Sequence, residues 1–157
     1  MIHLKTTRRK IDYLVVHCTV TREGQDISVE EIKRWHINKG WSDIGYHYVI
    51  LLDGSIKEGR PVSRIGAHVK GFNRNSIGIT YVGGVGLNLA PKDTRTNAQK
   101  RSLERLLKSL KQIYPTAKIW GHRDFSPDRN KNGIIEPFEW IKACPSFDAK
   151  REYKNIN

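Results

Sequence analysis

The sequence predicts an α/β fold, a single domain in which a central mixed β-sheet of about five strands is flanked by helices. The first observation behind this prediction is that short apolar runs alternate along the chain with amphipathic segments. The second is that 157 residues, 38% apolar and 28% charged, suit a globular chain with one core. No repeat, low-complexity tract or linker divides the sequence, so we expect one domain over residues 1–157 with its core in residues 11–151.

Five apolar runs predict the strands, because each is short and most are rich in β-branched or aromatic residues. They cover residues 11–17, 46–52, 55–58, 76–82 and 118–122. Asp53-Gly54 separates the second run from the third, which predicts a hairpin closed by a primed turn. Helical segments interleave with these runs, so we expect strands in mixed directions.

Capping boxes mark the starts of two predicted helices. The first box lies at residues 28–31, and Gly40 ends the helix that follows it. The second box lies at residues 96–99 and precedes leucines at helical spacing, until Pro115 closes that helix. Asp148 can start a short terminal helix.

The strongly basic composition favours a polyanionic partner. Lys and Arg number 28 against 16 Asp and Glu, a formal charge of +12, which suits nucleic acid, an acidic membrane surface or the anionic polymers of the bacterial envelope. No apolar run approaches the ~20 residues that span a membrane, so we expect no stable membrane insertion. No signal-peptide pattern opens the sequence, so we expect synthesis in the cytoplasm.

Two histidines and one cysteine are candidate metal ligands. His17 and His122 stand at the ends of predicted strands, where a rigid scaffold presents side chains to a cleft, and Cys144 follows a structural break. Two imidazoles and a thiolate form a three-ligand zinc site whose fourth position stays open to water. On spacing alone, a lone histidine on a strand is more often a buried structural residue than a metal ligand. Cys18 adjoins His17 on the strand, so it should point to the opposite face and lie in the core.

Seven short motifs carry a family resemblance. They are residues 45–50 (GYHYVI), 53–60 (DGSIKEGR), 66–73 (GAHVKGFN), 75–79 (NSIGI), 82–84 (VGG), 121–124 (GHRD) and 142–148 (KACPSFD). In this order they resemble the type 2 N-acetylmuramoyl-L-alanine amidase and peptidoglycan-recognition protein family, and most of all its phage lysozyme-type zinc amidases. The resemblance runs from about Ile11 to about Arg151 and implies the amidase fold of that family.

The resemblance also implies a reaction and its residues. Zinc would be held by His17, His122 and Cys144, and Tyr46 and Lys142 would line the catalytic centre. Non-catalytic members of the family typically lack the cysteine ligand, so the resemblance implies an enzyme. Its reaction is hydrolysis of the amide bond between N-acetylmuramic acid and L-alanine of bacterial peptidoglycan. Such an enzyme acts on the cell wall after lysis or phage-type export, or in cytoplasmic wall recycling.

Further polar residues are candidates for the substrate groove, namely His36, Trp41, His68 and Asn73. His47 directly follows Tyr46 on a predicted strand, so we expect it on the opposite face in a structural role. No glutamate stands in an evident general-base position, and the group that moves the proton stays open.

The segment before Cys144 is longer than in the phage-type relatives and contains a calcium-loop pattern. Residues 128–139 place oxygen-bearing side chains at positions 1, 3 and 5, Gly at 6 and Glu at 12 of an EF-hand loop. The ligands would be Asp128, Asn130, Asn132, the Ile134 carbonyl and Glu139. The alternative is an Asn/Gly-rich surface turn, because Ser126-Pro127 precedes the loop in place of a helix and two early ligands are uncharged.

Two rival functions use the same composition. A nucleic-acid-binding protein or metal nuclease would suit the charge, but clustered basic runs interleaved with stacking aromatics are missing, which makes nucleic acid an unlikely partner. A wall-binding module without activity is the second rival, since the resembling family contains such members.

Overall fold

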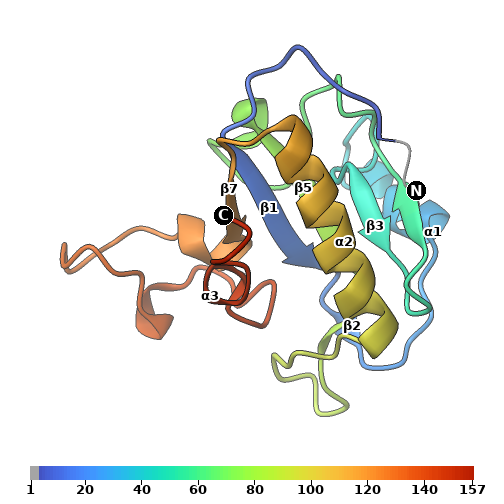
Figure 1. Cartoon of the computed structure of the whole chain (residues 1–157). Helices are drawn as coiled ribbons and strands as arrows, with labels where there is room; N and C mark the ends of the chain where they lie inside the picture. Colours follow the sequence, from blue (N-terminus) through green and yellow to red (C-terminus); the bar gives the residue numbers. More distant parts are fainter. Residues whose placement is uncertain (1–3) are drawn as a thin grey trace.

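A five-stranded mixed sheet organises the structure, a computed structural model that describes residues 4–157. Its strands stand in the order β4-β3-β5-β1-β7 (Figure 1). They are β1 (Tyr13–Cys18), β3 (Tyr48–Ile50), β4 (Ile56–Glu58), β5 (Ser76–Tyr81) and β7 (Lys118–Gly121). Strand β1 pairs in parallel with β5 and β7, β3 pairs in parallel with β5, and β4 is antiparallel to β3. The predicted mixed sheet of five strands is confirmed.

Helix α2 (Asn97–Ile113) covers one face of this sheet (Figure 1). It begins at the predicted capping box, in which Thr96 and Gln99 each bind the other's backbone N–H. Its leucine stripe is fully buried against the strands and comprises Leu103, Leu106, Leu107 and Leu110. These side chains share one hydrophobic cluster with the strand residues whose side chains point to the same face, Val16 and Cys18 among them. The prediction that Cys18 lies in the core is therefore confirmed.

Helix α1 (Val29–Asn38) belongs to a second, smaller core. Its Ile32 packs in one cluster with Ile44 and with Val49 of β3. Val49 alternates with Tyr48 and Ile50, which point toward α2, so this second core lies on the other face of the sheet. A two-stranded sheet of β2 (Thr21–Arg22) and β6 (Gly84–Val85) extends beyond the ends of β1 and β5.

The β3–β4 hairpin differs from the predicted primed turn. Leu51 N–H donates to the carbonyl of Ser55, so the loop has three residues, 52–54. Gly54 takes a left-handed φ of +85°, whereas Asp53 does not have a positive φ. The prediction of a primed turn is wrong because the strand pairing extends to Leu51 and Ser55, which leaves Gly54 as a left-handed residue closing a longer loop.

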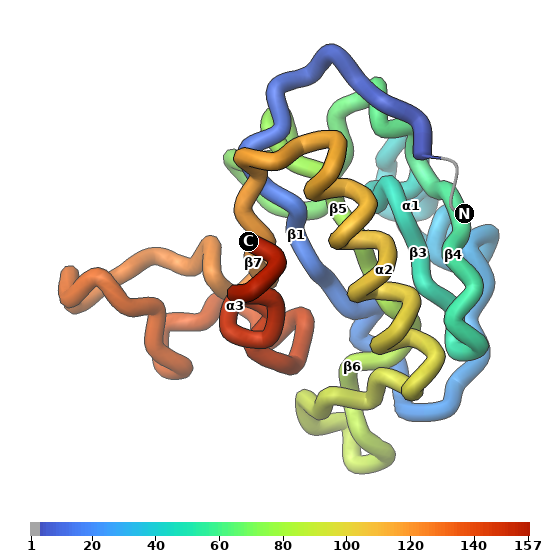
Figure 2. Tube along the Cα trace, in the orientation of Figure 1, coloured from blue at the N-terminus to red at the C-terminus, as the bar shows by residue number. Residues whose placement is uncertain are grey.

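The C-terminal third of the chain leaves the sheet and returns to it. After β7 come the 3-10 segments η2 (His122–Phe125) and η3 (Pro137–Glu139), followed by the short helix α3 (Ala149–Glu152). Figure 2 shows this orange segment extending away from the sheet before the chain returns beside β7. Helix α3 packs against β7. Within residues 4–157, none of the helices has the length and apolar character needed to cross a membrane.

Candidate metal centre

The parallel pairing of β1 with β7 brings His17 and His122 together. Val16 pairs with Gly121, so the residues that follow them, one in each chain segment, lie side by side at the same edge of the sheet. Their ring centroids are 4.7 Å apart. His17 alternates with Val16 and Cys18, and so it points to the face that α2 does not cover.

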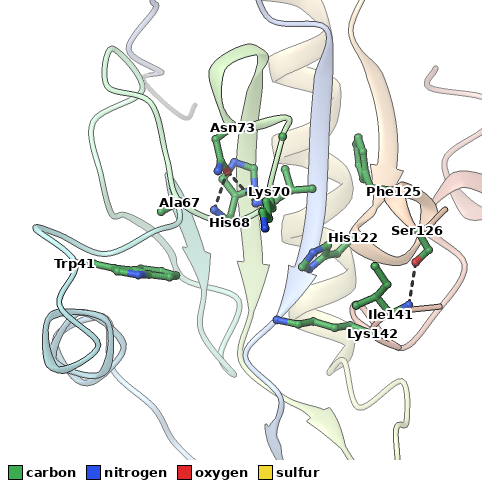
Figure 3. A pocket seen from close by; sticks show the side chains of 12 residues that line it. Trp41, Ala67, His68, Lys70, Asn73, His122, Phe125, Ser126, Ile141 and Lys142 are labelled. Atoms are coloured by element: carbon green, nitrogen blue, oxygen red, sulfur yellow. Dashed lines mark hydrogen bonds between the residues drawn. The ribbon is translucent and has the colours of Figure 1, made fainter.

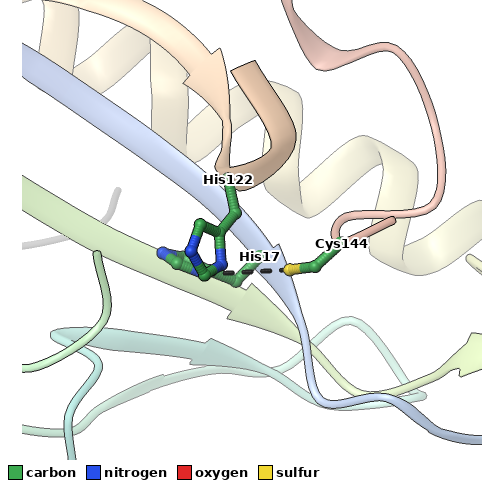
Figure 4. A group of neighbouring side chains, drawn as sticks. All are labelled: His17, His122 and Cys144. Carbon is green, nitrogen blue, oxygen red and sulfur yellow. Dashed lines mark hydrogen bonds between the residues drawn. The ribbon is translucent and has the colours of Figure 1, made fainter. Parts of the chain in front are cut away.

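Cys144 completes a cluster of three donor atoms (Figure 4). One ligand atom from each of His17, His122 and Cys144 lies within 4.8 Å of the other two. The Cys144 Sγ is 3.7 Å from Nδ1 of His17. Zinc bonds of about 2.0–2.1 Å to nitrogen and 2.3 Å to sulfur, at a tetrahedral angle, separate the two donors by about 3.6 Å. The spacing and the chemistry of these donors therefore fit a zinc ion.

Backbone contacts fix the position of Cys144. The Cys18 N–H donates to the Cys144 sulfur at 3.2 Å, and the Arg123 N–H donates to the Cys144 carbonyl at 2.9 Å. A Cβ on Gly121 would lie only 2.7 Å from Cδ of Pro145, so a glycine there lets the cysteine loop approach β7 closely. The loop is thus attached to β1, which carries His17, and to η2, which carries His122.

Burial sets the protonation of the donors. It is the main cause that lowers the pKa of His17 well below 6.5 and that of His122 to about 4, with the charge of Lys142 as a further cause. Both imidazoles are therefore neutral at pH 7, the form that binds metals. Burial also raises the pKa of the Cys144 thiol, so its thiolate form requires a cation beside it.

Tyr46 and Thr80 line the same centre. The ring centroids of Tyr46 and His17 are 5.2 Å apart, and burial raises the pKa of the Tyr46 phenol, which therefore keeps its proton and can donate a hydrogen bond. Thr80 pairs with His17 in the β1–β5 register. Its buried Oγ1 neighbours the Tyr46 hydroxyl but makes no hydrogen bond of good geometry within residues 4–157, which suits a polar group bound there. The sequence alone does not indicate Thr80, because only the strand register places this residue beside His17.

A cavity of about 540 Å³ opens beside the cluster. Figure 3 shows Trp41 on one side and His122, Lys142 and Ile141 on the other, with the loop of His68 and Asn73 between them. The exposed side chains of Trp41 and Lys142 are accessible to a ligand. Asn73 holds its own loop, since its Oδ1 accepts N–H bonds from His68 and Val69, both at 2.8 Å.

His36 and His47 make their contacts outside the cavity lining. His36 is absent from the cavity lining, and its Nδ1 accepts the Gly45 N–H at 2.8 Å while its ring packs 4.6 Å from that of Trp41. These contacts indicate that His36 supports the ring of Trp41 by packing against it. His47 is completely buried, and its Nδ1 accepts the Gly78 N–H at 3.0 Å. That environment suits the structural role expected of His47.

The segment with the calcium-loop pattern folds around its own backbone. Asp128 accepts N–H bonds from Asn132 and Gly133. Glu139 is buried beneath the loop, where its two oxygens accept N–H bonds from Arg129, Asn130 and Glu136. Among the residues described, only His17, His122 and Cys144 form a group of three His, Cys, Asp or Glu donors at metal-binding distance. The calcium ligands therefore stay a prediction from the sequence.

The fold and the donor cluster define a class of protein. Two imidazoles and one sulfur beside an α/β sheet are the number and kind of ligands that a catalytic zinc centre takes from its protein, and such centres are typical of metallohydrolases. Residues 7–134 match the family described as N-acetylmuramoyl-L-alanine amidase, and the chain belongs to this family.

Comparisons with individual proteins agree with this assignment. The endolysin of Klebsiella phage KP32 is 39% identical over 146 residues, which are 93% of this chain and 87% of that protein. Peptidoglycan-recognition protein SC2 of Drosophila melanogaster is 34% identical over 122 residues, 72% of this chain and 64% of that protein. Among solved structures, the N-acetylmuramoyl-L-alanine amidase LysC of Clostridium intestinale is 26% identical, with a TM-score of 0.69 over 94% of this chain and 83% of its own.

Proposed function

We propose that this chain hydrolyses the amide bond between N-acetylmuramic acid and L-alanine of bacterial peptidoglycan, with a zinc ion held by His17, His122 and Cys144. The observation that carries the proposal is the convergence of these three donors beside a cavity, in a chain of the amidase family. A set of two nitrogen donors and one sulfur donor favours zinc over calcium or magnesium. A bound zinc ion supplies Lewis-acid chemistry, which activates water near neutral pH and polarises a carbonyl group.

Lys142 supplies positive charge to the reacting carbonyl. Its side chain is exposed in the cavity, and its charge reaches both histidines, since it contributes to lowering their pKa values. An ammonium group at this position stabilises the oxyanion that develops as water attacks the amide. One well-placed donor of this kind is worth ~3–4 kcal/mol in the transition state.

Tyr46 supplies a neutral hydrogen-bond donor beside His17. Because its phenol stays protonated, it can hydrogen-bond the attacking water or the tetrahedral oxygen. Within residues 4–157 no carboxylate joins the three donors, so a glutamate base is not part of the proposed centre.

The cavity and the charge suit the polymer. Trp41 is 38% exposed at the cavity wall and offers an aromatic face to a sugar ring or an apolar stem residue. The net charge of +12 draws the protein to the anionic cell wall, where this activity acts after lysis or export; wall recycling in the cytoplasm is the alternative site. Peptidoglycan is accordingly the proposed partner.

Mass analysis of digested peptidoglycan tests the reaction. Purified walls incubated with zinc-loaded protein should release stem peptides with a free L-alanine amino terminus and intact glycan strands. Cys144→Ser removes the sulfur donor and should release none. Cleavage of glycosidic bonds in place of the amide would contradict the proposal.

The same variant separates the two rival functions. A wall-binding module would pellet with walls yet leave them intact in both wild type and Cys144→Ser. A nuclease would degrade nucleic acid in a metal-dependent way. If wild type and Cys144→Ser clear the walls equally, the metal assignment is wrong.

Calcium in residues 128–139 is a separate proposal that rests on the sequence pattern. Added calcium should raise the melting temperature of wild type but not that of Glu139→Gln. The proposed ligands are Asp128, Asn130, Asn132, the Ile134 carbonyl and Glu139. An equal response of both proteins, or none in either, would contradict a calcium site.

A further inference from the structure

His17 has a second partner on the side away from the sulfur. Its Nε2 lies 2.8 Å from Nδ1 of His68, and both rings are buried. The ring planes are nearly perpendicular, at 86°. Since Nδ1 of His17 faces the Cys144 sulfur, the two nitrogens of the His17 ring have different partners.

We propose that His68 is a positioning residue of the metal centre, whose Nδ1 accepts the Nε2–H of His17 and so keeps the Nδ1 lone pair of His17 free for the metal. The inference rests on the metal binding proposed above. A neutral imidazole carries one proton, and the hydrogen bond made by one nitrogen decides which form the other takes. If His68 donated instead, the proton of His17 would move to Nδ1 and block coordination.

Ser76 can accept the proton that this arrangement places on Nε2 of His68. Nε2 of His68 lies 3.2 Å from the buried Oγ of Ser76. When His68 donates its Nε2–H to that hydroxyl, its Nδ1 must present a lone pair to His17. With a metal on Nδ1 of His17, the order of donation runs from His17 to His68 and on to Ser76, in one buried chain.

Two glycines make room for the ring of His68. A Cβ on Gly78 of β5 would lie 2.6 Å from that ring, and one on Gly66 would lie 2.8 Å from it. The imidazole thus packs directly against the strand beside β1. Asn73 holds the backbone of His68 through its 2.8 Å bond to the N–H. The two glycines at the ring and the Asn73 bond at the backbone hold His68 in place, as a residue that orients a ligand requires.

Zinc affinity, measured by competition with a chromogenic chelator, tests the proposal. Loss of a partner that orients a ligand lowers metal affinity ~10–100-fold, and we expect that loss in His68→Leu. His68→Asn should recover most of it, because the Asn Oδ1 can take the place of the Nδ1 acceptor. A role in packing alone would lower the melting temperature of the metal-free protein in both variants without this difference in zinc affinity.

The tautomers of the wild type provide a test without substitution, which decides the matter even if His68→Leu fails to fold. Nitrogen NMR of the zinc-loaded protein should show both His17 and His68 protonated at Nε2. Protonation of His68 at Nδ1, or zinc affinity of a folded His68→Leu equal to that of wild type, would overturn the inference. Failure of the wild type to bind zinc would instead overturn the proposed function.

Discussion

At the level of single residues, Tyr46 offers a direct test of the proposed centre. Tyr46→Phe removes the protonated hydroxyl beside His17 and leaves the ring. We expect kcat for peptidoglycan hydrolysis to fall ~100–1000-fold, as it does when one transition-state donor is lost, with zinc affinity unchanged. Tyr48→Phe, on the buried face toward α2, is the matched control and should keep its activity. A fully active Tyr46→Phe would exclude the hydroxyl from catalysis.

His47 shows how burial couples stability to pH. The neutral ring accepts the Gly78 N–H at Nδ1 and donates from Nε2 to the carbonyl of Arg64. Burial lowers its pKa from 6.5 to about 4. Between these two values the unfolded chain binds a proton that the folded chain does not, so the stability contributed by His47 is present above pH 6.5 and is lost as the pH falls toward 4.

His47→Gln should therefore reduce the pH dependence of folding. One such group contributes a slope of up to ~1.4 kcal/mol per pH unit to the free energy of unfolding. Urea unfolding of the metal-free protein between about pH 4.5 and about pH 6, which lies inside this window, should show a slope smaller by most of that amount in the variant. An unchanged slope would mean that His47 titrates normally in the folded protein.

At the level of elements, the close approach of the cysteine loop to β7 depends on Gly121. Its φ of −82° suits any residue, so Gly121→Ala acts only through the 2.7 Å contact of the new Cβ with Pro145. We expect such overpacking to lower the free energy of unfolding by ~1–3 kcal/mol and to weaken zinc binding, because Cys144 adjoins Pro145. Gly86→Ala, whose Cβ would meet mobile ends of side chains, is the control. Equal zinc affinity in both variants would contradict this account.

Arg95 connects α3 to the loop that precedes α2. Its buried guanidinium donates to both carboxylate oxygens of Asp93 and of Glu152, and it lies 3.4 Å above the ring of Phe147. Both carboxylates are partly exposed and can be hydrated again when the cation is lost. Arg95→Met should therefore cost ~2–3 kcal/mol of unfolding free energy, less than the loss of a fully buried partner.

Urea unfolding measures this change, and Arg95→Lys should lie between wild type and Arg95→Met because it keeps the charge but not the paired hydrogen bonds. Since Phe147 follows Cys144 by three residues, the same loss should loosen the cysteine loop. An Arg95→Met protein as stable as wild type would show that the ion pairs contribute nothing.

At the level of the whole molecule, local patterns predicted the elements well. Capping boxes and the leucine spacing placed both long helices, and the apolar runs placed the five strands of the sheet. These signals are local, since each depends on residues a few positions apart. The hairpin turn was wrong because strand pairing extends to Leu51 and Ser55, which the residues of the turn alone do not reveal.

The site was predictable to a lesser extent. The positions of His17 and His122 at strand ends indicated them as candidate ligands. Cys144 joins them through a loop more than 100 residues from His17, and the family resemblance was needed to select this cysteine. The contact of His17 with His68 and the position of Thr80 depend on loop folding and strand register. No sequence spacing encodes such contacts, because they form only when the sheet is assembled.

A crystal structure of the zinc-loaded protein, with anomalous scattering recorded on both sides of the zinc edge, tests the central claim most directly. The account predicts a single strong peak bonded to His17 Nδ1, a nitrogen of His122 and Cys144 Sγ, at distances of ~2.0–2.3 Å, with a fourth position left for water or substrate. A peak bound elsewhere, or one that lacks any of these three donors, would contradict it.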